Sequence, residues 1–566
     1  MVREFPYITS RDRGRKALDA ASTRLSVRAH MVKARMIETL PLPESLSSAR
    51  VEGEHGRAVS WRTWTGFLFM CLGMFMAILD IQIVATSLPT IQKALGIATD
   101  QMSWVQTAYL IAEIVAIPLT GYLTRLLGMR RLFVVAITVF TLASAGCAAS
   151  HDFTSLIAWR VLQGFAGGTL IPAVFSAVFL MFPLRLQGIA TTIAGVAAVF
   201  APTVGPIVGG WLTQTYSWHW LFLVNIVPGI IAAIGAAALL PRRPVDRAEL
   251  RSVDALALAA MAVALTALEI GLKDAPSFGW ASLRVLSLLG LFALCGLAFV
   301  ARTLRSVHPV VELRSFADRN FTIGCILSFV LGIGLFGSTY LMPFFLGLVR
   351  GHGALEIGKI MLVTGMAQLL AAPVAVALER RVDPRLLTLL GFGMFAAGLW
   401  LSASQTKDTD FAQMMLPQVL RGASIMFCLL PPTRLALGRL PNHLVADGSG
   451  LFNLMRNLGG AIGLALIDTV IFSRGTDHAR TIGESLRAGD VDVAVSIGIP
   501  RELFLAQAGR PASEAAQNMA RPLIEKAALV QSINDAWMMI AVLTAAAVLL
   551  LPFVAKSRVA APGQTE

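Results

Sequence analysis

The chain repeats long apolar runs separated by short polar gaps, and this pattern limits its fold more than any other feature. A transmembrane helix needs roughly 20 consecutive, mostly apolar residues. About fourteen segments are this long; they lie near residues 64–87, 102–124, 131–150, 154–179, 187–213, 219–240, 253–272, 282–301, 321–348, 355–378, 385–404, 412–437, 448–472 and 532–555. The sequence therefore predicts an all-α membrane protein.

Composition supports this class. Of the 566 residues, 56% are hydrophobic and 14% are charged, whereas soluble domains carry roughly 25% charged residues. The net charge of +13 raises the alternative of a nucleic-acid-binding protein. Such proteins gather basic residues on a polar domain, but here they fall in the gaps between apolar runs. The charge therefore indicates membrane topology, and nucleic acid is not an expected partner.

The loops alternate in charge, which predicts how the chain is oriented. Arginines fill the gaps after the even-numbered spans, namely Arg125, Arg130, Arg131, Arg185, Arg242, Arg243, Arg247, Arg251, Arg302, Arg305, Arg314, Arg319, Arg380, Arg381, Arg385, Arg434 and Arg439. The gaps HD, TQTYS and TKDTD, after three odd-numbered spans, are poorer in Lys and Arg. Cytoplasmic loops carry the excess of basic residues. We therefore expect an even number of spans, both termini in the cytoplasm, and a multi-pass protein of the cytoplasmic membrane.

Two patterns that could indicate other chemistry do not hold up. The five cysteines lie inside predicted spans without CxxC spacing, which favours apolar packing over disulfides or a metal site. The segment GALEIGKI at residues 353–360 matches most of a phosphate-binding loop, but Ile360 replaces the Ser or Thr that would bind Mg²⁺. We also find no nucleophile–base constellation. The sequence predicts no metal site, no organic cofactor and no enzymatic activity.

Charged residues inside the spans are candidates for function, because they are costly in lipid unless paired or wet. Asp80 lies within FMAILDIQIVATSLPTI (75–91), Glu113 within AYLIAEIVAIPL, and Arg160 within LIAWRVLQGFAGGTLIPA. Asp80 is either a carboxylate that bonds a neighbouring helix or a group that titrates or binds a cation; the sequence favours the second. Burial favours the neutral form of Glu113, and a nearby cation such as Arg160 favours the charged form.

Four further charged residues are assigned by their position in the spans. Arg456 lies inside the thirteenth span, where it either pairs across a central cavity or holds its helix. Glu269, Glu356 and Asp468 lie nearer predicted span ends. We interpret these three carboxylates as interface residues.

Glycine and proline mark three further stretches. In GYLTRLLGMRR (121–131), Gly121 and Gly128 permit a tight turn, and the arginines form either a positive-inside loop or a gate hinge. In the fourth span Gly164 allows close helix packing. The fifth span concentrates residues that bend or tightly pack a helix, namely Pro202, Gly205, Pro206, Gly209 and Gly210.

Together these motifs resemble the major facilitator superfamily, and more closely its fourteen-span drug:proton antiporter branch of EmrB/QacA-type exporters. The first-span pattern reads Leu79-Asp80 and then Ser87-Leu88-Pro89. The R-x-x-Q-G motif is intact as Arg160, Gln163 and Gly164, and the antiporter motif reads APTVGPIVGG with Ala for its first Gly. Arg125 stands where the superfamily usually has Asp, which argues against the usual Asp-based cytoplasmic latch.

The resemblance implies a fold of two six-helix bundles with two additional helices between them. The bundles would be residues 62–241 and 305–556, the extra pair 242–304, and an extracytoplasmic loop 475–530 would include the amphipathic segment EAAQNMARPLIEKAALV. A disordered basic tail (1–61) and a short tail (557–566) would lie in the cytoplasm.

The resemblance also implies a function. It is proton-coupled export of lipophilic drugs, cationic or amphiphilic, by alternating access, with protons as the coupling ion. The alternative is a dedicated exporter or importer of one metabolite or siderophore-like compound. Members of this branch in two-membrane bacteria often work with a periplasmic adaptor and an outer-membrane channel, which are therefore expected partners.

Overall fold

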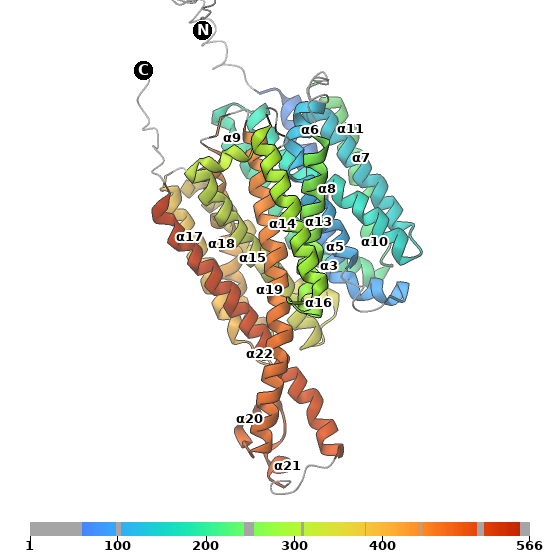
Figure 1. The fold of residues 1–566 in the computed structure, drawn as a ribbon, viewed down its shortest axis with the longest axis vertical. Coiled ribbons are helices and arrows are strands. Elements are labelled where there is room, and N and C mark those ends of the chain that lie inside the picture. The colour runs from blue at the N-terminus through green and yellow to red at the C-terminus, as the bar shows by residue number, and fades with distance from the viewer. Residues whose placement is uncertain are drawn as a thin grey trace, which may run out of the picture. The chain divides into compact units, whose positions relative to one another are not determined.

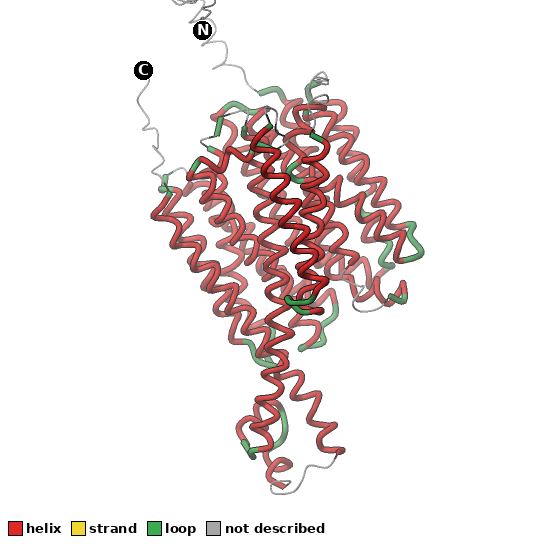
Figure 2. The backbone as a smooth tube through the Cα atoms, viewed as in Figure 1, coloured by secondary structure: helices red, strands yellow, loops and turns green. Residues whose placement is uncertain are grey.

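The computed structural model describes residues 59–97, 104–242, 254–306, 309, 311–379, 381–438, 440–441, 444–506 and 514–554. All regular structure in these residues is helical, as Figure 2 shows. Thirteen of the described helices are long and apolar enough to cross a membrane. A fourteenth span forms if the bent pair α5 (Trp104–Ala116) and α6 (Leu119–Leu127) is counted as one. The predicted all-α membrane fold with about fourteen spans is confirmed.

The bend in the second span has a local cause. The axes of α5 and α6 differ by 58°, and Pro118 lies between them, just before α6. Proline lacks a backbone N–H and cannot continue the hydrogen-bond ladder of a helix. The uninterrupted span expected at 102–124 is therefore broken in the structure.

Six spans form the first half of the molecule. They are α3 (Trp61–Leu95), α5 with α6, α7 (Met129–Ala148), α8 (Phe153–Met181), α9 (Leu184–Thr215), and α10 (Trp220–Leu223) with α11 (Ile226–Leu239). Within this half α3 packs against α9 and α11, and α8 packs against α5 and α7. The helices α3, α5 and α8 carry the charged residues Asp80, Glu113 and Arg160, which were predicted to lie inside the spans.

The second half also has six spans. They are α15 (Arg319–Leu348) after η1 (Leu313–Ala317), α16 (Ala354–Glu379), α17 (Pro384–Leu401) with η2 (Ser402–Ser404), α18 (Phe411–Leu437), α19 (Val445–Arg487), and α22 (Glu514–Ala546) with η3 (Ala547–Phe553). The two halves meet where α9 packs on α16 and where α19 packs on α6 and α8.

The extra pair is α13 (Ala255–Phe278) and α14 (Leu283–Arg305). The two helices pack on each other, and α13 also contacts α5 of the first half and α19 of the second. Figure 1 shows both in green in front of the bundle, beside the orange α19. Among the described spans α14 is the least buried. The inner helix of the pair therefore closes the seam between the halves, and the outer one faces lipid.

The segment 475–530 contains more helix than a polar loop would. Helix α19 continues to Arg487, and two short helices follow, α20 (Val491–Ile497) and α21 (Arg501–Ala506). The predicted amphipathic segment is confirmed as the first part of α22. Apolar contacts around Ile482, Ile497 and Ala528 hold these helices together. The tails 1–58 and 557–566 lie outside the described residues.

The close approach of α5 and α8 generates a prediction about stability. A Cβ atom at Gly164 would lie 2.2 Å from the backbone oxygen of Tyr109, so Gly164→Ala should force the helices apart. Overpacking of this kind costs about 1–3 kcal/mol, which thermal unfolding of the purified protein would detect as a lower Tm. Gly393→Ala in α17 is the matched control, because a Cβ there meets nothing within 4 Å. Equal behaviour of the two variants would contradict this packing role.

Candidate functional site

Asp80 is the centre of a buried polar network in the first half. Its Oδ2 accepts from Nη1 of Arg160 at 2.5 Å. Its Oδ1 accepts from Nε2 of Gln163 at 2.9 Å and from Nδ2 of Asn225 at 2.8 Å. Neither Asp80 nor Arg160 is exposed at all. The carboxylate is therefore tolerated because α8 and the start of α11 supply a counter-charge and two further donors.

The arginine of this pair is held on several sides. Its Nε donates to the carbonyl oxygen of Val105 at 2.9 Å, and Nη1 also donates to Oε1 of Gln163 at 2.7 Å. Its guanidinium lies over the ring of Tyr109, 4.5 Å from the centroid. Because the side chain of Arg160 is fully buried among these groups, it does not extend to the membrane interface. Asp80 bonds its neighbouring helices, as the first of its two predicted roles requires, and titration would first have to break this pair.

Glu113 lies in a different environment. It is 3% exposed, and no hydrogen bond or ion pair joins its carboxyl group to another residue in the described part of the chain. It lines a small cavity of about 20 Å³ together with Leu110, Ile114, Glu269, Phe336, Asn457, Gly460, Ala461 and Leu464. These residues come from α5, α13, α15 and α19. The cavity therefore lies where both halves and the extra helix meet, and its volume suits a water molecule but not a drug.

Glu269 corrects an expectation from the sequence. It was predicted at the membrane interface, yet it is 8% exposed, and its Oε2 is buried without a hydrogen-bond partner in the described residues. The reason is the length of its helix: α13 runs to Phe278 and not to residue 272, so Glu269 lies well inside the span. Glu356 agrees with an interface position, since its side chain is 62% exposed.

Arg456 adds a positive charge to the same region. Its guanidinium donates to Oδ1 of Asn453, one turn away on α19. Its charge and those of Arg160, Glu269 and Asp80 act electrostatically on Glu113. Arg456 thus bonds within its own helix, as the second of its two predicted roles requires, and no ion pair across the cavity joins it to another described residue.

Arg421 is a buried charge that the sequence analysis passed over. It lies on α18, is 3% exposed, and its guanidinium lies 4.8 Å from the ring centroid of Trp537. A sequence signal was available: QVLRG at 418–422 repeats RVLQG at 160–164 with the Arg and Gln exchanged. Each half therefore carries a buried arginine in a related five-residue motif, at the first position in the first half and at the fourth position in the second half.

The cytoplasmic ends of the two halves are joined by an ion pair. Nη1 of Arg125, in the last turn of α6, donates to Oδ2 of Asp447 at 2.6 Å, and Asp447 is 5% exposed in the first turn of α19. An acid in the first turn of a helix is also stabilised by the helix dipole. The arginine that replaces the usual Asp therefore still supports a contact, with Arg on the first half and Asp on the second.

The two glycines of this motif have different roles. Gly128, between α6 and α7, has a φ of +75°, which confirms the predicted turn. Gly121 does not form a turn. It lies within α6, where a Cβ would be 1.9 Å from Oδ1 of Asp447, so its missing side chain makes room for the ion pair.

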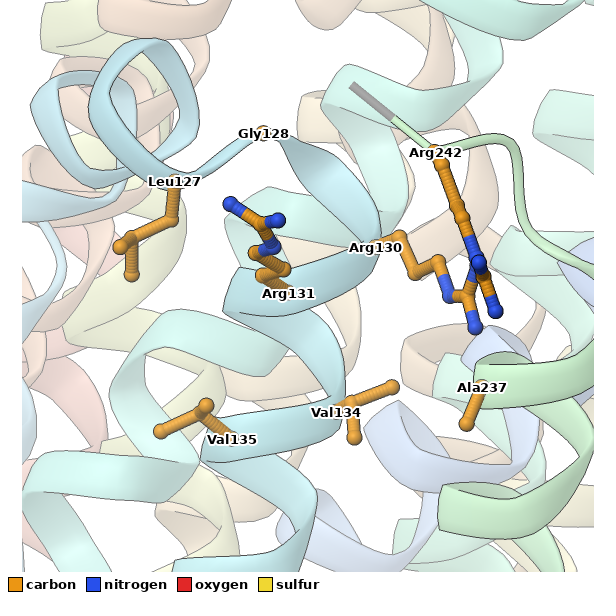
Figure 3. Close-up of a pocket in the computed structure, with 8 residues that line it drawn as sticks. All are labelled: Leu127, Gly128, Arg130, Arg131, Val134, Val135, Ala237 and Arg242. Carbon is orange, nitrogen blue, oxygen red and sulfur yellow. The ribbon is translucent and has the colours of Figure 1, made fainter. Parts of the chain in front are cut away.

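Arg130 and Arg131, the other arginines of this motif, line a separate cavity of about 440 Å³, shown in Figure 3.

The proline- and glycine-rich stretch of α9 lies between the two halves. A Cβ at Gly205 would be 2.5 Å from Cβ of Gln82 on α3. The hydroxyl of Ser87 donates to the carbonyl oxygen of Gly209 at 3.4 Å. On α16, a Cβ at Gly358 would lie 2.9 Å from the backbone of Pro206. The motif, which also includes Pro202 and Gly210, therefore follows the line along which α9 touches α3 and α16.

Comparison with known proteins gives a consistent result. The sequence profile of the Major Facilitator Superfamily matches residues 70–464. The colistin resistance protein EmrB of Acinetobacter baumannii is 38% identical over 429 residues, 75% of this chain and 83% of the relative. The multidrug export protein EmrB of Escherichia coli strain K12 is 30% identical over 419 residues, 74% and 82% of the two chains.

Two further similarities extend this result. The fatty acid resistance protein FarB of Neisseria gonorrhoeae is 31% identical over 433 residues, 76% of this chain and 84% of the relative. Among solved structures, the proton:xylose symporter XylE superposes with a TM-score of 0.54 at 12% identity, covering 88% of this chain and 97% of the other. At that identity the superposition concerns the fold alone.

The buried ion pair predicts a specific pattern of stability. Asp80→Asn should strongly destabilise the protein, because Arg160 is left buried without a counter-charge. Removing one partner of a buried pair costs about 3–5 kcal/mol. Asp80→Asn combined with Arg160→Gln should recover part of that loss in thermal unfolding of the purified protein. If Asp80→Asn alone is as stable as wild type but inactive in transport, the titrating role of Asp80 is correct and the structural one is wrong.

The cytoplasmic ion pair predicts a charge-swap rescue. Arg125→Asp should open this contact by facing two carboxylates, and Arg125→Asp with Asp447→Arg should close it again. A cysteine placed at buried Ser449, in a background without the native cysteines, would report opening through its labelling rate. A charged hydrogen bond of ~1.5–3 kcal/mol corresponds to at least about tenfold faster labelling.

Arg185→Asp is the control for this swap, since Arg185 is an exposed arginine on the same side of the protein. It should leave the labelling rate of Ser449→Cys unchanged. Failure of the double swap to slow labelling would show that the pair does not hold the two halves together.

Proposed function

The chain belongs to the Major Facilitator Superfamily, and we propose that it exports lipophilic drugs, cationic or amphiphilic, in exchange for protons. It is a multi-pass protein of the bacterial inner membrane. Relatives that cover most of its length are named for multidrug export and for resistance to colistin and to fatty acids. That range of compounds favours a broad export function over a dedicated carrier of one metabolite.

The cavity of Glu113 and Glu269 is the observation that carries this proposal. A carboxylate buried between the halves is most stable when its charge is neutralised, either by a proton or by a bound cation. Proton and cationic drug therefore compete for the same group. If the halves separate on one side at a time, this competition exchanges a proton entering the cell for a drug leaving it.

Glu113 is our candidate for the proton-carrying group. It has no counter-charge in contact among the described residues, whereas Asp80 is already paired with Arg160. A proton on Asp80 would have to displace a guanidinium, but a proton on Glu113 displaces nothing. Asp80, Arg160 and Gln163 then act as positioning residues that hold α3, α8 and α11 in place, and Arg456 tunes the charge of Glu113 from the opposite half.

The available energy suffices for this exchange. A proton that moves down 100 mV provides about 2.3 kcal/mol, and a difference of one pH unit provides about 1.4 kcal/mol. For an uncharged amphiphile exchanged for one proton, both contributions act and sustain a substrate gradient of roughly 500-fold. A monovalent cationic drug exchanged for one proton moves no net charge, so the pH difference alone drives that exchange, to about tenfold. Protons therefore serve as the coupling ion, and the proposal needs no organic cofactor, metal or enzymatic step.

The helical extension of α19 and α22 is the part we propose as a contact for a periplasmic adaptor. Its short helices pack around Ile482, Ile497 and Ala528 and leave Val495 48% exposed. A folded, partly apolar surface outside the membrane suits a protein partner better than a solvated loop does. An adaptor would in turn connect the exporter to an outer-membrane channel.

Transport by proteoliposomes tests the function and the role of Glu113. With an acidic interior, wild type should accumulate tetraphenylphosphonium as protons leave. Glu113→Gln should abolish this uptake, because a neutral amide cannot exchange a proton for a cation, while Glu113→Asp should retain part of it. Glu269→Gln should reduce uptake without abolishing it.

Glu356→Gln provides the matched control, since it neutralises an exposed carboxylate away from the cavity. A fatty acid serves as an amphiphilic second substrate. If wild type moves neither compound against its gradient, the export function is wrong. If Glu113→Gln transports at the wild-type rate, the proton is carried elsewhere.

A further inference from the structure

A second cavity lies between α7 and α11, away from the central acids. Its volume is about 440 Å³, and its lining residues are Leu127, Gly128, Arg130, Arg131, Val134, Val135, Ala237 and Arg242. Figure 3 shows the guanidinium ends of Arg130 and Arg242 overlapping beside Ala237 in this view, while the guanidinium of Arg131 lies on the other side, below Gly128. The cavity thus combines three guanidinium groups with apolar walls.

Among the residues that the structure describes, no carboxylate pairs with the three arginines. No acidic side chain lines the cavity in the described residues. No ion pair or hydrogen bond links the side chains of Arg130, Arg131 or Arg242 to any residue that the structure describes. Like charges that converge repel one another unless an anion lies between them. The arrangement therefore favours an anionic ligand with several acceptor oxygens, as a phosphate has.

The position of the cavity narrows the choice of anion. It lies at the start of α7 and just past the end of α11, on the arginine-rich side that the loops identify as cytoplasmic. Below it, α7 exposes Val135 and Leu142, while α11 exposes Ile234 and Val227. These apolar residues continue from the cavity into the membrane, so a ligand there meets charge at one end and an apolar surface along its length.

We propose that this cavity binds an anionic phospholipid of the cytoplasmic leaflet. Arg130 and Arg242 would bind the phosphate, Arg131 would add a third charge, and the acyl chains would lie along the exposed residues of α7 and α11. Basic pockets at the cytoplasmic surface bind anionic headgroups in this way. The site is separate from the proposed drug and proton site and does not depend on it.

Lipid titration of the detergent-purified, full-length protein tests this proposal. Native mass spectrometry would measure binding of phosphatidylglycerol, with phosphatidylcholine and inorganic phosphate as comparison ligands. Wild type should prefer phosphatidylglycerol. Arg130→Gln with Arg242→Gln should weaken its binding by about fivefold for each arginine removed. Because no transport is measured, this result is independent of the export function.

Two further variants make the test specific. Ala237→Phe should also weaken binding, because it fills the cavity while every arginine is kept. Arg185→Gln removes an exposed arginine from the same side, outside the cavity, and should leave binding unchanged.

Three results would overturn the proposal. They are equal binding of phosphatidylcholine, displacement of the lipid by inorganic phosphate alone, and an equal loss in Arg185→Gln. The first would remove the need for an anionic lipid, the second would indicate a free anion, and the third would indicate a diffuse surface charge. A double variant that elutes at the same volume as wild type and binds phosphatidylglycerol equally well would also refute the site.

Discussion

Inside a bilayer a charged side chain finds neither water nor counter-ions, so the protein itself has to supply its partner. The pairing of Asp80 with Arg160 shows how the need for a buried counter-charge constrains the packing of several helices. Three donors converge on one carboxylate from α8 and the residue before α11, and the bond from Arg160 to Val105 adds the start of α5. A shift of α3 against α8 would leave two buried charges unpaired, and a shift of α5 or α11 would remove a hydrogen bond from one of them. The network therefore favours motion of the first half as one body.

The two carboxyl groups at the boundary between the halves, unlike that of Asp80, have few partners. Glu113 and Glu269 share a small cavity and lack the dense set of partners that surrounds Asp80. A buried carboxyl group without hydrogen-bond partners lowers the stability of the protein. Here these groups lie where α5, α13 and α19 meet. An exchanger needs both kinds of site. Its helices must keep their packing during transport, while its binding carboxyl group must accept either a proton or a substrate. The extra helix α13 joins the site by contributing one of the two carboxylates.

The basic loop between α6 and α7 serves two separate contacts. Arg125 faces the second half and pairs with Asp447, while Arg130 and Arg131 face the cavity beside α11. The departure from the family motif at Arg125 therefore does not remove a contact between the halves in this protein. Its acidic partner lies in the first turn of α19, where the helix dipole also favours an acid. One loop thus combines a link between the halves with a surface toward the membrane.

The sequence by itself determined the spans and the motifs of the family, because hydropathy, glycine and proline act through neighbours along the chain. It predicted that Asp80, Glu113 and Arg160 lie within the membrane, and they do. It could not determine which way a charged side chain faces, since that depends on helices that pack from distant parts of the sequence. Glu269 was misplaced because local hydropathy ended its span too early. The partner of Arg125 lies 322 positions away, and only tertiary packing of the two halves brings them together.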